Sequence, residues 1–144
     1  MAMLAKLVLF AGLAIPLLLT AQQLTPEMAS HARLAQDAER RNDFSTAVHE
    51  YRLLVQTLPN SAQVQSNLGV ALYFDQELRP AIEAFHKAIA IDPNLMAPHL
   101  FSGLAWYQLS NPDSAVPELE KAVRINAKDP IAHANTIFFG NWSP

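Results

Sequence analysis

The sequence of 144 residues contains no cysteine and only four glycines. A chain without cysteine cannot contain a disulfide, a thiolate metal site, a cysteine nucleophile or a lipidated N-terminal cysteine. Four scattered glycines are too few for a loop that cradles a phosphate group. Charged residues make up 16% of the chain and the formal net charge is −3, which disfavours a protein that binds the nucleic-acid backbone.

Apolar residues, by contrast, make up 51% of the chain. This fraction is too high for a disordered protein, and it can supply a hydrophobic core. The length predicts about one domain.

The N-terminal segment 1–21 has the three-part form of a secretory signal peptide. Lys6 gives a positive start, Leu7–Leu19 is an uncharged apolar run, and the small residues Thr20 and Ala21 follow. That run is shorter than the roughly 18–20 residues that span a bilayer as a helix. We therefore expect cleavage after Ala21 and a short leader over residues 22–27. An uncleaved anchor stays open, because Leu19 lies three residues before the cut, where a small residue is usual.

The remaining chain repeats with a 34-residue period, in blocks 28–61, 62–95 and 96–129, with a fourth block that begins at Pro130. The blocks share small residues at their eighth and twentieth positions, a large side chain at the twenty-fourth and mostly proline at the thirty-second. These residues are Ala35, Gly69 and Gly103; Ala47, Ala81 and Ala115; Tyr51, Phe85 and Leu119; and Pro59, Pro93 and Ala127. Such self-similarity is typical of a repeat architecture.

Each block has the pattern of two helices joined by a turn. In the second block, apolar residues three and four apart predict helices over 63–75 and 79–91, and Asp92-Pro93 ends the second helix. Gly69 would allow the two helices to approach closely. We expect Gly69→Leu to overpack this contact and Gly69→Ala to be mild, because Ala35 occupies the same position in the first block.

The second block resembles the tetratricopeptide repeat family. The residues that match its signature spacings are Leu68-Gly69, Ala81, Phe85, Ala88 and Pro93. The resemblance covers residues 28–129 and implies an all-α, right-handed solenoid of three helix-turn-helix repeats plus a partial fourth helix. It also implies a concave groove that binds a peptide or protein. The sequence departs from the signature at the fourth position of each block, where His31, Gln65 and His99 replace a large aromatic residue, and at Ser102, which replaces leucine.

The resemblance places the groove mainly on the first helix of each pair. The groove candidates carried over by position are Arg33, Gln36, Arg40, Asn67, Tyr73, Phe74, Phe101, Tyr107 and Gln108. The alternative for the arginines is a salt-bridged surface, since acidic residues interleave with them, and the alternative for the aromatic residues is packing. Ala32, Ser66 and Leu100 stand where chaperone-binding members carry a carboxylate clamp, so we do not expect that clamp.

Candidate catalytic and metal-binding residues are few. His31, His99 and His133 share the fourth position of their blocks, and neighbouring packed helices lie on the order of 10 Å apart, too far to share one zinc ion. The sequence shows no His-x-x-x-His spacing, no His–Glu pairing and no Gly-x-Ser-x-Gly motif. No pair of carboxylates stands out as the two opposed groups that a glycosidase needs. It therefore predicts no enzymatic activity, no metal and no cofactor.

The C-terminal segment leaves the repeat pattern. Residues 130–137 begin a fourth first-helix, and Phe138, Phe139 and Trp142 then form an apolar end. A terminal solenoid helix should present a polar outer face. Three alternatives follow: the segment folds back over the third block, it meets a partner, or the chain is truncated relative to a longer array.

Taken together, the sequence predicts an exported, non-enzymatic adaptor or scaffold that holds a protein or peptide in its groove. The form of the signal favours the periplasm, or secretion, with no nucleic-acid partner and no membrane span in the mature chain. One alternative is a small assembly subunit that forms homo-oligomers through its apolar C-terminal end. Another, from a different class, is a hydrolytic enzyme. The identity of the partner does not follow from the sequence.

Overall fold

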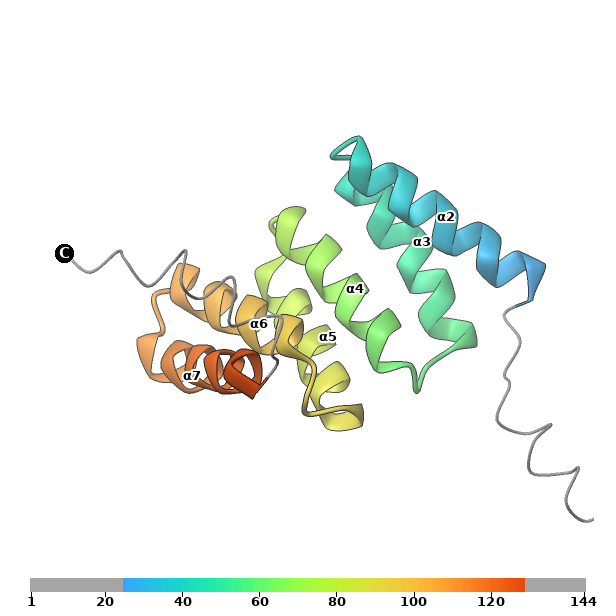
Figure 1. The fold of residues 1–144 in the computed structure, drawn as a ribbon. Helices are drawn as coiled ribbons and strands as arrows, with labels where there is room; N and C mark the ends of the chain where they lie inside the picture. Colours follow the sequence, from blue (N-terminus) through green and yellow to red (C-terminus); the bar gives the residue numbers. More distant parts are fainter. Residues whose placement is uncertain (1–24, 129–144) are drawn as a thin grey trace, which may run out of the picture.

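The computed structural model describes residues 25–128, which form six helices in three consecutive pairs (Figure 1). The helices are α2 (Pro26–Arg40), α3 (Phe44–Thr57), α4 (Ala62–Phe74), α5 (Leu78–Ile91), α6 (Met96–Gln108) and α7 (Pro112–Lys128). The predicted all-α solenoid of helix pairs is confirmed, and the bounds expected in the second block differ from α4 and α5 by one residue at most. Four predicted segments lie outside the described residues: the signal peptide, residues 22–24 of the leader, the partial fourth helix and the apolar end.

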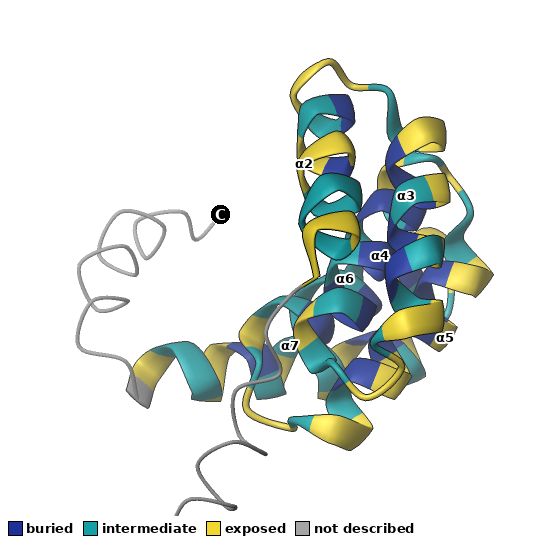
Figure 2. Cartoon of the chain, turned by 90° about the vertical axis from the view of Figure 1, so that its right-hand side faces the viewer, coloured by how far each residue is buried: buried dark blue, intermediate teal, exposed yellow. Residues whose placement is uncertain are grey.

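The pairs stack in chain order. The two helices of each pair contact one another, α3 contacts α4, α5 contacts α6, and α4 also contacts α6. The buried residues lie between the helices, and the exposed residues lie on the outer surfaces (Figure 2). None of the helices within residues 25–128 is long and apolar enough to cross a membrane.

The turn inside each pair has the same backbone geometry. Asn42, Gln76 and Ser110, each at the fifteenth position of its block, have positive φ angles of 57°, 64° and 56°. In every turn the amide of this residue bonds to a carbonyl three residues back, and the next amide bonds to one five residues back. This is the Schellman motif, which satisfies carbonyl groups at the end of a helix. A positive φ favours glycine, but none of the three residues is glycine.

We expect Gln76→Gly to raise the free energy of unfolding by about 0.5–1 kcal/mol, because glycine adopts the left-handed conformation without the cost that glutamine bears. Asn42→Gly is the matched control, since asparagine tolerates this conformation better than glutamine. Urea unfolding of the two variants measures the difference. A loss of stability in Gln76→Gly would contradict the turn geometry.

Close contacts between helices explain the small residues at the eighth position. A Cβ atom added to Gly69 would lie 2.5 Å from Phe85 Cδ1 and 2.9 Å from Phe85 Cζ. A Cβ atom added to Gly103 would lie 2.6 Å from Leu119 Cγ. Phe85 is fully buried, so its ring has no solvent-side space to move into. This geometry opposes the expectation that Gly69→Ala is mild, because the added Cβ atom requires the Phe85 ring to move.

Ser102 places a polar side chain in the core of the third block. The side chain is fully buried, and its hydroxyl has no hydrogen-bond partner among the described residues. The equivalent residue of the second block, Leu68, is buried in the core. The serine at this position leaves a desolvated polar atom, which costs stability.

Candidate functional site

Four aromatic side chains from three helices meet at the surface of the stacked pairs, and we call them the aromatic cluster: Phe44, Tyr73, Phe74 and Phe101. The rings of Phe44 and Phe74 stack with centroids 5.1 Å apart, and Phe101 meets Tyr73 and Phe74 edge-on at 5.3 and 5.9 Å. Aromatic pairs in these arrangements add about 0.5–1.5 kcal/mol each beyond their buried area. Phe74 is nevertheless 45% exposed, so one ring of the cluster remains open to solvent.

The cluster joins the core on one side and the end of α6 on the other. Phe101 stacks on the buried Phe85 with ring centroids 6.2 Å apart. Gln108 donates a hydrogen bond from Nε2 to the hydroxyl of Tyr73. Tyr107, beside Gln108 in the sequence, is 70% exposed. The structure thus brings together Tyr73, Phe74, Phe101 and Gln108, and it leaves Tyr107 as a large aromatic side chain in solvent.

The candidates on α2 lie on exposed surface. Arg33, Gln36 and Arg40 are all exposed, and Arg40 forms an ion pair with Asp37 one turn away on the same helix. A pair between two exposed side chains adds little stability. These side chains are therefore available to a partner, but the helix does not hold them in one orientation.

Asn67 is half-buried and takes part in a polar network between α2, α3 and α4. Its Oδ1 accepts a hydrogen bond of 2.8 Å from Gln63 Nε2, and its side chain also bonds to the Tyr51 hydroxyl. Burial, with the neighbouring charge and hydrogen bond of Glu39, raises the pKa of Tyr51 to about 12. Burial likewise raises the pKa of Glu39, against the opposing hydrogen bond from Tyr51. The network ties three helices together and requires a neutral tyrosine.

Two histidines pair with glutamates on the next helix of the chain. His31 Nδ1 lies 2.6 Å from Glu50 Oε2, and His99 Nδ1 lies 2.7 Å from Glu118 Oε2. The expectation of no His–Glu pairing is therefore wrong, because the fold brings together residues that lie 19 positions apart in the sequence. A signal was present in the sequence, because both histidines hold the fourth position of their block and both glutamates hold the twenty-third.

The second ring nitrogen of His99 contacts the backbone of the preceding repeat. Nε2 lies 3.0 Å from the carbonyl oxygen of Pro93, in the connection between α5 and α6. Gln65 makes the same contact one repeat earlier, since its Nε2 donates to the carbonyl oxygen of Pro59 at 3.3 Å. Both ring nitrogens of His99 thus have an oxygen atom within hydrogen-bond distance, one on Glu118 and one on Pro93. The polar residue at the fourth position thus links each of these two repeats to the one before it.

Residues 25–128 contain no group of three or more His, Cys, Asp or Glu side chains placed to hold a metal ion. Each paired histidine uses its Nδ1 for its glutamate. The pairs therefore act as contacts between helices.

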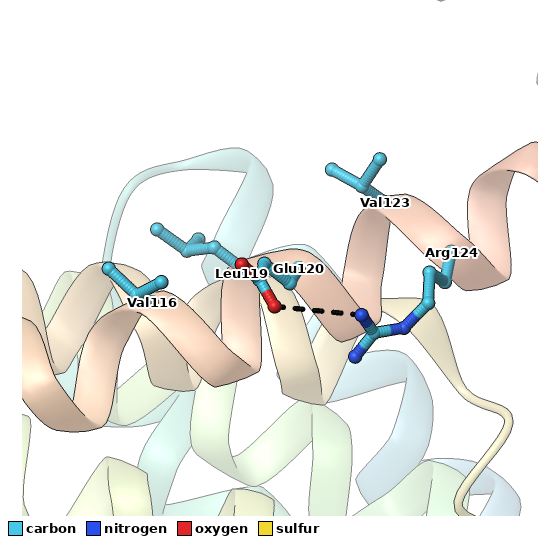
Figure 3. A pocket seen from close by; sticks show the side chains of 5 residues that line it. All are labelled: Val116, Leu119, Glu120, Val123 and Arg124. Atoms are coloured by element: carbon cyan, nitrogen blue, oxygen red, sulfur yellow. Dashed lines mark ion pairs between the residues drawn. The ribbon is translucent and has the colours of Figure 1, made fainter.

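The outer surface of α7 is a second candidate site, which we call the α7 face: Val116, Leu119, Glu120, Val123 and Arg124. These five side chains line an open hollow of about 430 Å³ (Figure 3). Val116 and Val123 are 51% and 64% exposed, and Glu120 pairs with Arg124 at 3.5 Å. Exposed apolar surface of this kind is a candidate contact surface for another segment or molecule.

Comparison with known proteins identifies the fold. No protein family matches the sequence in a scan, and no curated protein matches it in a search. Among solved structures, the chain is similar to the TPR2B domain of yeast Sti1 in complex with pHsp70, with a TM-score of 0.68, 23% identity, and 72% of this chain and 83% of that chain covered. It is also similar to the CopN–Scc3 complex, with a TM-score of 0.70, 17% identity, and 77% and 66% covered.

MamA from Desulfovibrio magneticus RS-1 gives a TM-score of 0.66 at 20% identity, with 79% of this chain and 62% of that chain covered. The chain also covers only 60% of a second MamA structure, so it spans about three fifths of the length of these proteins. Similarity at this level of identity shows the fold, which is the tetratricopeptide-type solenoid of helix pairs.

Proposed function

We propose that this protein is a non-enzymatic scaffold that binds a protein or peptide segment over the aromatic cluster and Tyr107. The observation that supports the proposal is the pair of exposed aromatic side chains, Phe74 at 45% and Tyr107 at 70%, on the ends of successive first helices. Large aromatic side chains and arginines supply most of the binding energy in protein interfaces. Arg40 ends α2, the preceding first helix, and adds a charge for the same partner.

The similar structures support a polypeptide as the ligand. The TPR2B domain of Sti1 was solved in complex with pHsp70, and the CopN–Scc3 structure is a complex of two proteins. We further propose that the protein is exported to the periplasm or secreted, because residues 1–21 have the form of a signal peptide.

Peptide selection followed by substitution tests the binding surface. Peptides selected from a displayed random library on the purified chain provide the probe, and fluorescence anisotropy gives the Kd. We expect Tyr107→Ala to raise the Kd by about 5–10-fold, a loss of about 1 kcal/mol or more, with little change in Tm because the side chain is exposed.

Ile91→Ala is the matched control, because Ile91 is also exposed, at 42%, but ends a second helix. Equal weakening by Tyr107→Ala and Ile91→Ala, or failure to select any peptide, would contradict the proposed surface. Export has a separate test, since intact-mass measurement of the mature protein should show a chain that begins at Gln22.

A further inference from the structure

The charged side chains of the three first helices are all on one of them. The sequence of α2 contains two arginines and three acidic residues, whereas α4 contains no charged residue and α6 contains no Lys, Arg, Asp or Glu. The histidine of α6, His99, is buried and contacts Glu118. A partner that lies across the first helices therefore meets full charges only on α2.

The exposed face of α2 has an excess of positive charge. Arg33, Asp37 and Arg40 are three and four residues apart, so they lie on one side of the helix. Asp37 pairs with Arg40, and Arg33 has no ion pair within residues 25–128. Glu39 hydrogen-bonds to the Tyr51 hydroxyl, and the third acidic residue of the helix lies in its first turn. A carboxylate that approaches this face has Arg33 as an available partner.

The same repeat positions on α4 and α6 carry uncharged side chains. Phe74 is exposed, Val70 and Leu104 are half-buried, and Gln108 is exposed. The equivalent residues of the three helices are Arg33, Asn67 and Phe101 at the sixth position, Gln36, Val70 and Leu104 at the ninth, and Arg40, Phe74 and Gln108 at the thirteenth. The surface thus changes along the stack from charged on α2 to apolar, aromatic and carboxamide on α4 and α6.

Side-chain contacts connect these helices. The Tyr51 hydroxyl bonds to Glu39 of α2 and to Asn67 of α4. Tyr73 of α4 accepts a hydrogen bond from Gln108 of α6, and its ring meets Phe101 at 5.3 Å. A charged group of a partner that is desolvated against α4 or α6 would find no opposite charge on either helix, which is costly.

We propose that the partner is a polypeptide segment that carries acidic side chains at one end and uncharged aliphatic and aromatic side chains at the other. The acidic end lies against Arg33 on α2, and the apolar end lies against the aromatic cluster and Tyr107. This inference rests on the function proposed above and adds the composition and the placement of the bound segment. Arg33 then selects for charge, because it is the unpaired cation of the surface.

A charge-swap experiment tests the acidic end. The probes are fluorescein-labelled synthetic peptides with leucine, phenylalanine and tyrosine at one end and glutamates, glutamines or lysines at the other, each made with the charged end N-terminal or C-terminal. We expect the wild-type chain to bind the better glutamate peptide about 3–10-fold more tightly than the lysine peptide at low salt, and Arg33→Glu to reverse this order. The preference should shrink as salt is added, because exposed charges are screened.

Arg79→Glu is the matched control, because Arg79 is also exposed and without an ion pair within residues 25–128, but lies on the second helix α5. It should keep the wild-type order of the peptides, and both variants should keep the wild-type Tm. An unchanged order in Arg33→Glu, or the same reversal in Arg79→Glu, would overturn the proposal.

A second set of peptides tests the apolar end. Replacement of the leucine, phenylalanine and tyrosine by serine should raise the Kd at least tenfold, and Tyr107→Ala should have no further effect on the serine peptide. Equal binding of the serine peptide would overturn the proposal. Failure of every designed peptide, while library-selected peptides still lose affinity in Tyr107→Ala, would overturn this composition and leave the proposed function standing. Selected peptides that are insensitive to Tyr107→Ala would contradict the proposed function itself.

Discussion

Phe85→Ala is expected to lower the free energy of unfolding by about 3–5 kcal/mol, the range for loss of a buried phenylalanine. The ring is fully buried, it stacks on Phe101 of the next repeat, and it fills the space left by Gly69 in its own repeat. Removal of the ring therefore opens a cavity at the junction of α4, α5 and α6. Urea unfolding followed by circular dichroism measures the change.

Phe74→Ala is the control for that result. Phe74 also stacks on aromatic neighbours, but it is 45% exposed and truncation leaves no closed cavity. We expect it to cost clearly less than Phe85→Ala. Equal losses would mean that Phe85 does not hold the second and third repeats together.

Gly69→Ala is expected to lower the free energy of unfolding by about 1–3 kcal/mol, and Gly69→Leu by more, because the added atoms enter the space of the Phe85 ring. A methyl group in a helix normally stabilises it, since alanine has a higher helix propensity than glycine. The sign of the change in unfolding free energy therefore tells whether the clash with Phe85 or the higher helix propensity of alanine is the larger contribution. A gain in stability would show that the Phe85 ring moves aside without cost.

Combination with Phe85→Leu tests the cause. Leucine lacks the ring atoms that the new Cβ would meet, so the double variant should lose less stability than the sum of the single losses. Additive losses would place the strain elsewhere. The first block shows that alanine and an aromatic residue can occupy the equivalent positions, since Ala35 and Tyr51 are both buried there.

The close contact at Gly69 shows a limit of predicting one repeat from another. A 34-residue period places Gly69 and Ala35 at equivalent positions, but it does not place the ring that each one meets. Tyr51 directs its hydroxyl to Glu39 and Asn67, whereas Phe85 has no such group and stacks on Phe101. The local neighbours of each ring, and not the period, decide how much room the eighth position has.

Repeat position predicts only part of the aromatic cluster. Tyr73, Phe74 and Phe101 were carried to one surface by position, and the structure groups them, but the fourth ring, Phe44, comes from the start of α3 and was not among the candidates. Asn67 was a candidate by position, but it belongs to the polar network of Tyr51. Side-chain partners from another helix decided both outcomes.

The sequence by itself determined the helices, their order and their pairing, because apolar spacing and a strict 34-residue period are local and repeated signals. Only the tertiary structure decided the His31–Glu50 and His99–Glu118 pairs and the left-handed turn residue at Gln76. It also decided that Val116 is exposed while Ile82 is buried. These features depend on which helix lies against which, and two positions with the same place in the repeat acquire different environments when the neighbour on one side differs.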